Sequence, residues 1–144
     1  MSALTFTDYA RRASETAIFT PKESADALHY CALKLCSEAG EIVGKLGKFQ
    51  LKRRMKDGLS EGYPISPNEL TQEQRNDLLL EVGDCLWYLS QLSRILSDPT
   101  GEYSRDRDEA FENVANANLQ KLKARAEAGT IVGHGDGVTD RKAV

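Results

Sequence analysis

Apolar residues recur at alternating spacings of four and three along two long stretches of the chain. The first stretch continues to about Lys52, and the second ends before the turn at residues 98–101. This spacing places the apolar side chains on one face of an α-helix, in a seam of heptad type. The seam residues are Leu28, Ala32, Leu35, Ala39, Ile42, Leu46 and Phe49 in the first stretch, and Leu78, Val82, Cys85, Leu89, Leu92 and Leu96 in the second. We therefore predict two long helices whose seams face each other.

Capping sequences mark where these helices begin. Residues 20–23 (Thr-Pro-Lys-Glu) and 71–74 (Thr-Gln-Glu-Gln) are capping boxes, and the first has proline at the first helical position. Residues 57–70 carry two glycines and two prolines, so we expect a long loop there. Within that loop, residues 66–69 (Ser-Pro-Asn-Glu) predict a single helical turn.

Two further helices complete the expected fold. A short polar helix is predicted over residues 7–17, and a longer one from about residue 104 or 106 to Ala128, with Gly129 as its C-terminal cap. Its expected stripe contains Phe111, Val114, Ala115, Asn118, Leu122 and Arg125. No strand pattern is present, so we predict an all-α, four-helix-bundle-like fold in a single domain over residues 1–144, with its core at about 20–129 and an irregular glycine-rich tail at 130–144.

The composition argues against nucleic-acid binding and against a membrane span. The chain has 144 residues and a formal net charge of −3, so a strongly basic nucleic-acid-binding surface is not expected. No apolar run of membrane-spanning length and no signal-peptide pattern are present, so we expect a cytoplasmic protein, in the host cytoplasm if it is phage-encoded. Cys31, Cys36 and Cys85 have no metal-site or disulfide spacing, and we interpret Cys31 and Cys85 as reduced core residues.

Each long helix carries a pair of acidic residues three positions apart. These are Glu38 with Glu41, and Glu81 with Asp84. Side chains at this spacing lie on one helical face, so each pair directs two carboxylates the same way. Four converging carboxylates repel one another unless a cation lies between them. A hard divalent cation such as Mg²⁺ or Mn²⁺, which takes oxygen ligands, suits this set.

Lysines extend the acidic positions into a charged stripe beside the first seam. The stripe contains Lys34, Glu38, Glu41, Lys45 and Lys48. Lys45 and Lys48 lie about 6 and 10 Å beyond Glu41 along the helix axis, which suits a polyphosphate that continues from a metal ion. The alternative is a solvated face with ion pairs four residues apart, Glu38 with Lys34 and Glu41 with Lys45. The second acidic pair, beside the other seam, favours the metal site.

Other metal and phosphate motifs do not match. Neither acidic pair contains the histidine of a di-iron bundle, and clustered Cys and His ligands for zinc are absent from the sequence. The Gly40 to Lys45 segment is too short for a phosphate loop and lies within a predicted helix. Glycines at positions 40, 44 and 47, and Gly83 in the second helix, indicate either close helix packing or a backbone left open for a ligand.

Several runs resemble the MazG-type all-α nucleoside triphosphate pyrophosphohydrolases. They are residues 35–41 (Leu-Cys-Ser-Glu-Ala-Gly-Glu), 44–48 (Gly-Lys-Leu-Gly-Lys), 81–89 (Glu-Val-Gly-Asp-Cys-Leu-Trp-Tyr-Leu) and 118–125 (Asn-Leu-Gln-Lys-Leu-x-x-Arg). The tail resembles the Gly-x-Gly-Asp-x-Arg ending of small single-domain members, including phage-encoded ones. The resemblance covers roughly residues 28–141. Ser37 departs from it, because many members carry a second glutamate there.

The resemblance implies Mg²⁺- or Mn²⁺-dependent hydrolysis of a (deoxy)nucleoside triphosphate to the monophosphate and pyrophosphate, with more than one ion per site. A purine deoxynucleotide such as dGTP is the expected substrate. The implied catalytic and metal-binding residues are Glu38, Glu41, Glu81 and Asp84, and the implied substrate-binding residues are Lys34, Lys45, Lys48, Asn118, Lys121 and Arg125. One carboxylate, not identified by the sequence, would handle the attacking water.

The family is dimeric or tetrameric, so the resemblance also implies a homodimer or homotetramer with sites near or across subunit interfaces. Apolar residues outside the seams, such as Val43 and Leu79, independently favour association. Trp87 and Tyr88 are candidates to flank a base or to lie in the core, and Asn118 is either a ligand contact or a polar residue at the bundle edge. The competing functions are a non-enzymatic oligomeric helical interaction module and a nucleotide sensor.

Overall fold

The backbone is helical through most of the chain that the computed structural model describes, which is residues 3–18, 25–58, 64–97 and 105–130. These residues form four α-helices and one 3-10 turn, and they contain no strand. The elements are α1 (Phe6–Glu15), α2 (Ala25–Asp57), the 3-10 turn η1 (Pro67–Glu69), α3 (Gln72–Ser97) and α4 (Arg105–Glu127). The predicted all-α class is confirmed. None of these helices is both long enough and apolar enough to cross a membrane.

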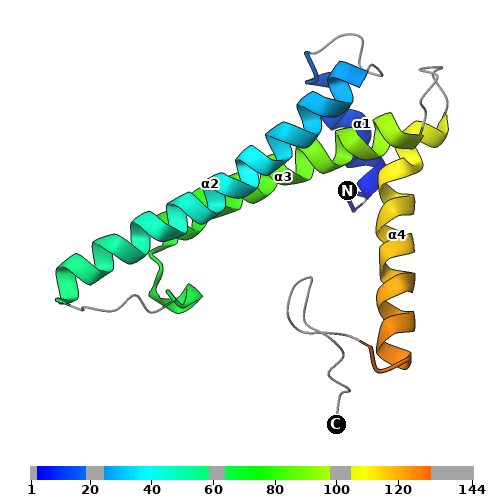
Figure 1. Cartoon of the computed structure of the whole chain (residues 1–144). Helices are drawn as coiled ribbons and strands as arrows, with labels where there is room; N and C mark the ends of the chain where they lie inside the picture. Colours follow the sequence, from blue (N-terminus) through cyan, green and yellow to red (C-terminus); the bar gives the residue numbers. More distant parts are fainter. Residues whose placement is uncertain (1–2, 19–24, 59–63, 98–104, 131–144) are drawn as a thin grey trace.

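α2 and α3 run side by side in opposite directions and form a long hairpin (Figure 1). α4 leaves the end of α3 at a steep angle, and α1 packs in the corner against α3 and α4 (Figure 1). The main packing partners of α4 are therefore α3 and α1. A single chain does not close a four-helix bundle, so the bundle stays a prediction for an assembled form.

Aromatic residues hold the corner between α1, α3 and α4 together. The ring of Phe111 in α4 is buried and meets the ring of Phe6 edge-on, with centroids 5.0 Å apart. Tyr9 packs on the same ring at 6.4 Å. From α3, the indole Nε1 of Trp87 donates a hydrogen bond to Thr16 Oγ1 at 2.9 Å, just past the end of α1. This short amphipathic helix is thus fixed to both of its neighbours.

Most predicted helix boundaries that lie among the described residues are confirmed by their capping hydrogen bonds. At the start of α3, Thr71 Oγ1 accepts from the Gln74 backbone N–H at 3.1 Å, and Gln74 Oε1 accepts from the Thr71 N–H at 2.8 Å. After α4, Gly129 has φ +65°, and the Thr130 N–H reaches the Arg125 carbonyl at 2.9 Å. This is the hydrogen bond of a helix C-terminus closed by a left-handed glycine.

The predicted single turn in the loop also forms. Its first backbone amide, that of Ser66, donates to Glu69 Oε2 at 2.7 Å. α1 begins close to its predicted start, with Thr5 as the N-cap, whose Oγ1 accepts from the Asp8 N–H at 3.0 Å. The capping box predicted at residues 20–23 lies outside the described residues.

α2 is longer than predicted, since it continues past Lys52 to Asp57. Gly58 then takes φ +65°, a conformation that side chains with a Cβ rarely adopt, and the helix ends there. The extra turn has a partner in the loop, because Arg53 Nη1 lies 2.6 Å from Glu69 Oε2 in η1. The loop predicted to begin at Asp57 therefore begins at Gly58.

The predicted seams are confirmed in part. Leu28 and Leu92 pack against the core between α2 and α3, but the exposed members of each seam are replaced in the helix contact by the residues one position earlier. Seam residues such as Ala39 and Val82 are exposed, whereas the residues just before them, Glu38 and Glu81, are buried. Cys31, also just before a seam residue, is fully buried in the small core between α2 and α3. The pattern of apolar residues does not reveal this register, because two of the contact positions carry carboxylates.

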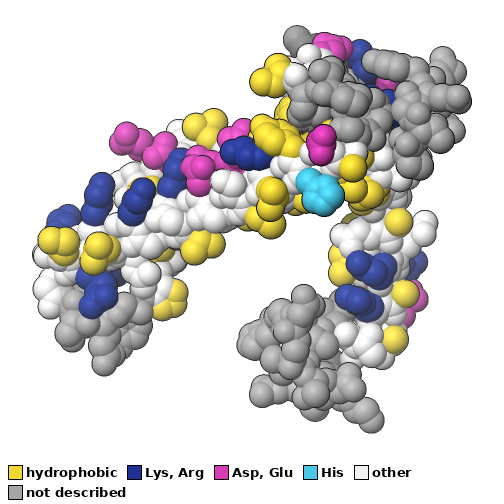
Figure 2. Space-filling view, turned by 45° about the horizontal axis from the view of Figure 1, so that its top comes forward, with side chains coloured by type: hydrophobic (Ala, Val, Ile, Leu, Met, Phe, Trp, Pro, Cys, Tyr) yellow, Lys and Arg dark blue, Asp and Glu magenta, His cyan; other side chains and the backbone are white. Residues whose placement is uncertain are grey.

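The exposed seam residues form a surface together with Val43. A residue one position after a contact residue lies about 100° further around the helix. In an antiparallel pair of helices, the two stripes of such residues lie on the same side of the hairpin. We call this surface the open apolar face; its residues are Ala32, Ala39, Val43, Val82, Leu89 and Leu96. Charged side chains also gather along the hairpin, and hydrophobic side chains lie exposed near them (Figure 2).

Replacing Phe111 with Ala should destabilise the corner and release α1. The ring is 7% exposed and contacts both Phe6 and Tyr9, so its removal should cost about 3 kcal/mol in the free energy of unfolding. Urea unfolding followed by circular dichroism measures this cost. The matched control is Leu33→Ala on α2, where the side chain is 71% exposed and the cost should be below about 0.5 kcal/mol. Equal costs for the two variants would contradict the assignment of Phe111 to the core.

Candidate metal centre

Three of the four predicted carboxylates converge at the middle of the hairpin. Glu38 and Glu41 come from α2 and Glu81 from α3, and one oxygen of each lies within 4.8 Å of the others. Glu38 and Glu81 are 7% and 8% exposed, respectively, whereas Glu41 is exposed to solvent. This arrangement arises because Glu38 and Glu81 lie in the helix contact, where the sequence predicted Ala39 and Val82. We call these three residues the acidic cluster.

Asp84, the fourth predicted carboxylate, is exposed and does not belong to the acidic cluster. It lies almost one turn further along α3 and interacts with α1: the pKa of Tyr9 is raised, mainly by burial and also by the negative charge of Asp84. No sequence motif selects Tyr9, which lies in the helix predicted only as a short polar element. Its position beside Asp84 follows only from the packing of α1.

Each buried carboxylate has a lysine as its counter-ion. Lys34 Nζ lies 2.8 Å from Glu38 Oε1, and Lys45 Nζ lies 2.6 Å from Glu81 Oε1. Lys45 Nζ also donates to the backbone carbonyl of Asp77 at 3.3 Å. The hydrogen bond to Glu38 raises the pKa of Lys34, and the hydrogen bond to Glu81 raises the pKa of Lys45. Both ammonium groups are therefore charged at neutral pH.

The lysine contacts match the sequence predictions in part. The pair of Lys34 with Glu38, four residues apart, forms as the solvated-face alternative supposed. Lys45 instead crosses to Glu81 on the neighbouring helix, so it bridges α2 and α3. Lys48 is exposed about one turn beyond Lys45, at a position from which it can reach a ligand in solvent.

The predicted site residues of α4 lie apart from the acidic cluster within one chain. Asn118, Lys121 and Arg125 are exposed on the half of α4 that points away from the hairpin (Figure 1). The single chain therefore does not bring them to the carboxylates.

Aromatic side chains lie next to the acidic cluster, towards the start of α2. The rings of Tyr30 and Tyr88 meet edge-on with centroids 6.2 Å apart, and the Trp87 ring meets Tyr88 at 4.8 Å. Burial raises the pKa of Tyr88 most, and its hydrogen bond to Tyr30 and the charge of Glu38 raise it further. Trp87 is half-buried and anchors α1, which supports its interpretation as a core residue. Tyr30 was not selected from the sequence, although it lies four residues before Lys34.

The oxygen-rich composition of the acidic cluster fits a hard divalent cation. Three carboxylates meet at a point accessible from solvent through Glu41, and carboxylate oxygens are the ligands that Mg²⁺ and Mn²⁺ prefer. The soft ligand nearby is Cys85, and its pKa is raised, first by burial and then by the charge of Glu38. Its thiol is therefore protonated at neutral pH and is a poor metal ligand. The thiol of Cys31 is buried, and burial raises its pKa to about 11.

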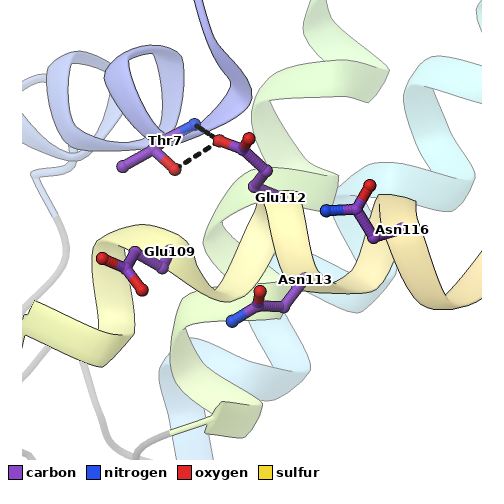
Figure 3. A pocket seen from close by; sticks show the side chains of 5 residues that line it. All are labelled: Thr7, Glu109, Glu112, Asn113 and Asn116. Atoms are coloured by element: carbon purple, nitrogen blue, oxygen red, sulfur yellow. Dashed lines mark hydrogen bonds between the residues drawn. The ribbon is translucent and has the colours of Figure 1, made fainter.

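A separate pocket of about 250 Å³ lies between α1 and α4 (Figure 3). Its lining residues are Thr7, Glu109, Glu112, Asn113 and Asn116. Glu112 Oε2 accepts hydrogen bonds from Thr7 Oγ1 at 2.6 Å and from the Thr7 N–H at 3.3 Å (Figure 3). This carboxylate thereby ties the first turn of α1 to α4. None of the predicted site residues lines the pocket.

The helical glycines have open space beside their Cα atoms among the residues that the structure describes. A Cβ atom added at Gly40, Gly44, Gly47 or Gly83 would meet nothing within 4 Å. Close helix packing inside the single chain therefore does not explain them. The alternative, a backbone left open for a ligand, stays a prediction.

Comparison with known proteins finds a phage relative. No protein-family model matches the chain, and no solved structure matches it. The "Gene 37 protein" of Mycobacterium phage L5 is 36% identical over 131 residues, which are 89% of this chain and 94% of the relative. Its phage source agrees with the expected phage-type relatives, and its name states no activity. The chain therefore belongs to the family of the Gene 37 protein of Mycobacterium phage L5.

Proposed function

We propose that the chain is a metal-dependent nucleoside triphosphate pyrophosphohydrolase. It would hydrolyse a (deoxy)nucleoside triphosphate between the α and β phosphates and release the monophosphate and pyrophosphate. The main support is the convergence of Glu38, Glu41 and Glu81 within 4.8 Å, with Lys34 and Lys45 beside them. The resemblance to MazG-type enzymes adds the reaction type. A purine deoxynucleotide such as dGTP is the proposed substrate.

Glu38, Glu41 and Glu81 are the proposed Mg²⁺ or Mn²⁺ ligands, and Asp84, exposed on α3, is the remaining carboxylate of the two acidic pairs. When bound, a divalent cation neutralises phosphate charge and makes a coordinated water easier to deprotonate. Glu41 and Asp84 are exposed, so they are accessible to water and to a substrate. One of the four carboxylates accepts the proton of the attacking water in this proposal.

The lysines of α2 are the proposed contacts of the polyphosphate. Lys45 and Lys48 follow the acidic cluster along the helix, so a chain of phosphates that starts at the carboxylates would continue beside them. An ammonium group on a flexible stem suits this role, since it can follow phosphate oxygens whose positions change during the reaction. The edge-to-face rings of Tyr30 and Tyr88 lie at the opposite end of the cluster, where they are available to a base.

We also propose that a second copy of the chain covers the open apolar face, as in a homodimer or homotetramer. Val43 and Leu96 are 69% and 66% exposed, respectively, and continuous apolar stripes of this kind are typical of association surfaces. Assembly would also give the projecting α4 a partner, and so could bring Asn118, Lys121 and Arg125 of one chain to the carboxylates of another. The exposed stripe favours the non-enzymatic interaction module as the second candidate function.

Replacing Glu41 with Gln should lower the rate of pyrophosphate release by about 100-fold or more. The change removes one charge from the acidic cluster at an exposed position, so the helical circular dichroism signal should be retained. Pyrophosphate release is measured over a panel of ribo- and deoxynucleotides with Mg²⁺, Mn²⁺ or a chelator. The matched control is Glu127→Gln, an exposed glutamate near the end of α4, which should keep full activity.

The same assay separates the candidate functions. Metal-dependent release from at least one nucleotide supports the pyrophosphohydrolase. Nucleotide affinity that requires metal but yields no product indicates a sensor. If the wild-type chain neither binds nor hydrolyses any nucleotide in the panel, the interaction module is the better description.

Replacing Leu89 with Lys should weaken assembly. Leu89 lies on the open apolar face and is 43% exposed, so a charge there would be buried in the proposed interface. Light scattering after size exclusion should give at least twice the chain mass of 15.9 kDa for the wild type and a lower mass for the variant. Leu33→Lys, on another side of α2, is the control and should leave the mass unchanged. A monomeric wild-type chain at all concentrations would refute this part of the proposal.

A further inference from the structure

The two buried carboxylates of the acidic cluster are already paired with lysines in the free protein. Glu38 and Glu81 are buried in the helix contact, yet each is already neutralised by an ammonium group at 2.8 and 2.6 Å, respectively. A buried carboxylate requires such a partner, since an unpaired buried charge is strongly unfavourable. The free protein therefore carries its own cations where the proposed metal would bind.

An ammonium group and a divalent cation compete for the same carboxylate oxygens. The Nζ atoms of Lys34 and Lys45 lie against Oε1 of Glu38 and of Glu81. A divalent cation placed among these oxygens would repel both ammonium groups at short range. We therefore expect metal binding to displace both ammonium groups.

Both lysines are placed so that they can move to a ligand. The side chains of Lys34 and Lys45 are 38% and 28% exposed, respectively, while those of their glutamate partners are only 10% and 11% exposed. The carboxylates thus stay fixed in the helix contact, and the ammonium groups at the surface rotate on flexible stems. A polyphosphate on this side of the hairpin offers the displaced groups new anionic partners.

We propose that Lys34 and Lys45 couple metal binding to polyphosphate binding. In the free protein they occupy Glu38 and Glu81 and weaken the binding of a divalent cation alone. When metal and polyphosphate arrive together, the ammonium groups transfer from carboxylate to phosphate oxygens. This inference rests on the proposed function. Because coupling between two ligands is reciprocal, phosphate strengthens metal binding by the same factor by which metal strengthens phosphate binding.

Direct titration with Mn²⁺ tests the coupling without catalysis. Free Mn²⁺ is measured by electron paramagnetic resonance for the wild type, Lys45→Met and Lys34→Met, with no nucleotide present. Each substitution removes the competing ammonium group and keeps the length and apolar character of the stem. Mn²⁺ alone should bind Lys45→Met about tenfold more tightly than it binds the wild type.

A second titration measures the affinity for polyphosphate when Mn²⁺ is bound. An α,β-methylene deoxynucleoside triphosphate, which cannot be cut at the proposed bond, is titrated calorimetrically into each protein at saturating Mn²⁺. Lys45→Met should bind this analogue about tenfold more weakly than the wild type does, because the transferred contact is missing. The control is Lys123→Met in α4, which removes an exposed lysine paired with Glu127 and should change neither affinity.

The outcomes separate the inference from the function on which it rests. If both lysine variants keep their helical signal but bind Mn²⁺ no more tightly than the wild type, the lysines are fixed structural partners and the coupling is refuted, while the metal site stands. If no protein binds Mn²⁺, with or without the analogue, the proposed function itself fails. Tighter Mn²⁺ binding joined to weaker analogue binding supports the coupling.

Discussion

Two carboxylates buried between antiparallel helices are the constraint on which the hairpin depends. Glu38 and Glu81 occupy positions where a helix contact usually places leucine or isoleucine, and charge in such a place is tolerated only with a close partner. Lys34 supplies that partner from the same helix, and Lys45 supplies it across the contact. The helices are therefore held here by charge and hydrogen bonding, and apolar packing concentrates further along, around Cys31 and Ile95.

The other two helices stabilise the opposite end of α3. Arg94 is 6% exposed and pairs with Asp108, so it joins α3 to the first turns of α4. α1 then fills the corner through Phe111 and Trp87. This divides the chain into a firmly packed corner and a hairpin that extends from it. The acidic cluster lies on the extended part, where Glu41 is exposed to solvent.

Features governed by local interactions could be predicted from the sequence. The helix caps at Thr71 and Gly129 depend on residues within one turn, so they can be predicted without knowledge of the fold. The register of the hairpin is not local. The contact within one chain keeps seam residues such as Leu28 and Leu92 but uses Glu38 and Glu81 in place of Ala39 and Val82. No rule of hydrophobic pattern selects a glutamate for a core position.

The candidate site shows the same division between local and distant interactions. The spacing of Glu38 and Glu41 predicted two carboxylates on one face, and Glu81 joined them because both helices carry the acidic pair at corresponding heights. That Lys45 pairs with Glu81 depends on the register and could not be read from spacing along one helix. The open apolar face and the acidic cluster lie on different sides of the hairpin. A partner bound on the apolar side would leave Glu41 exposed, so a substitution on the open apolar face can block assembly while the acidic cluster itself stays intact.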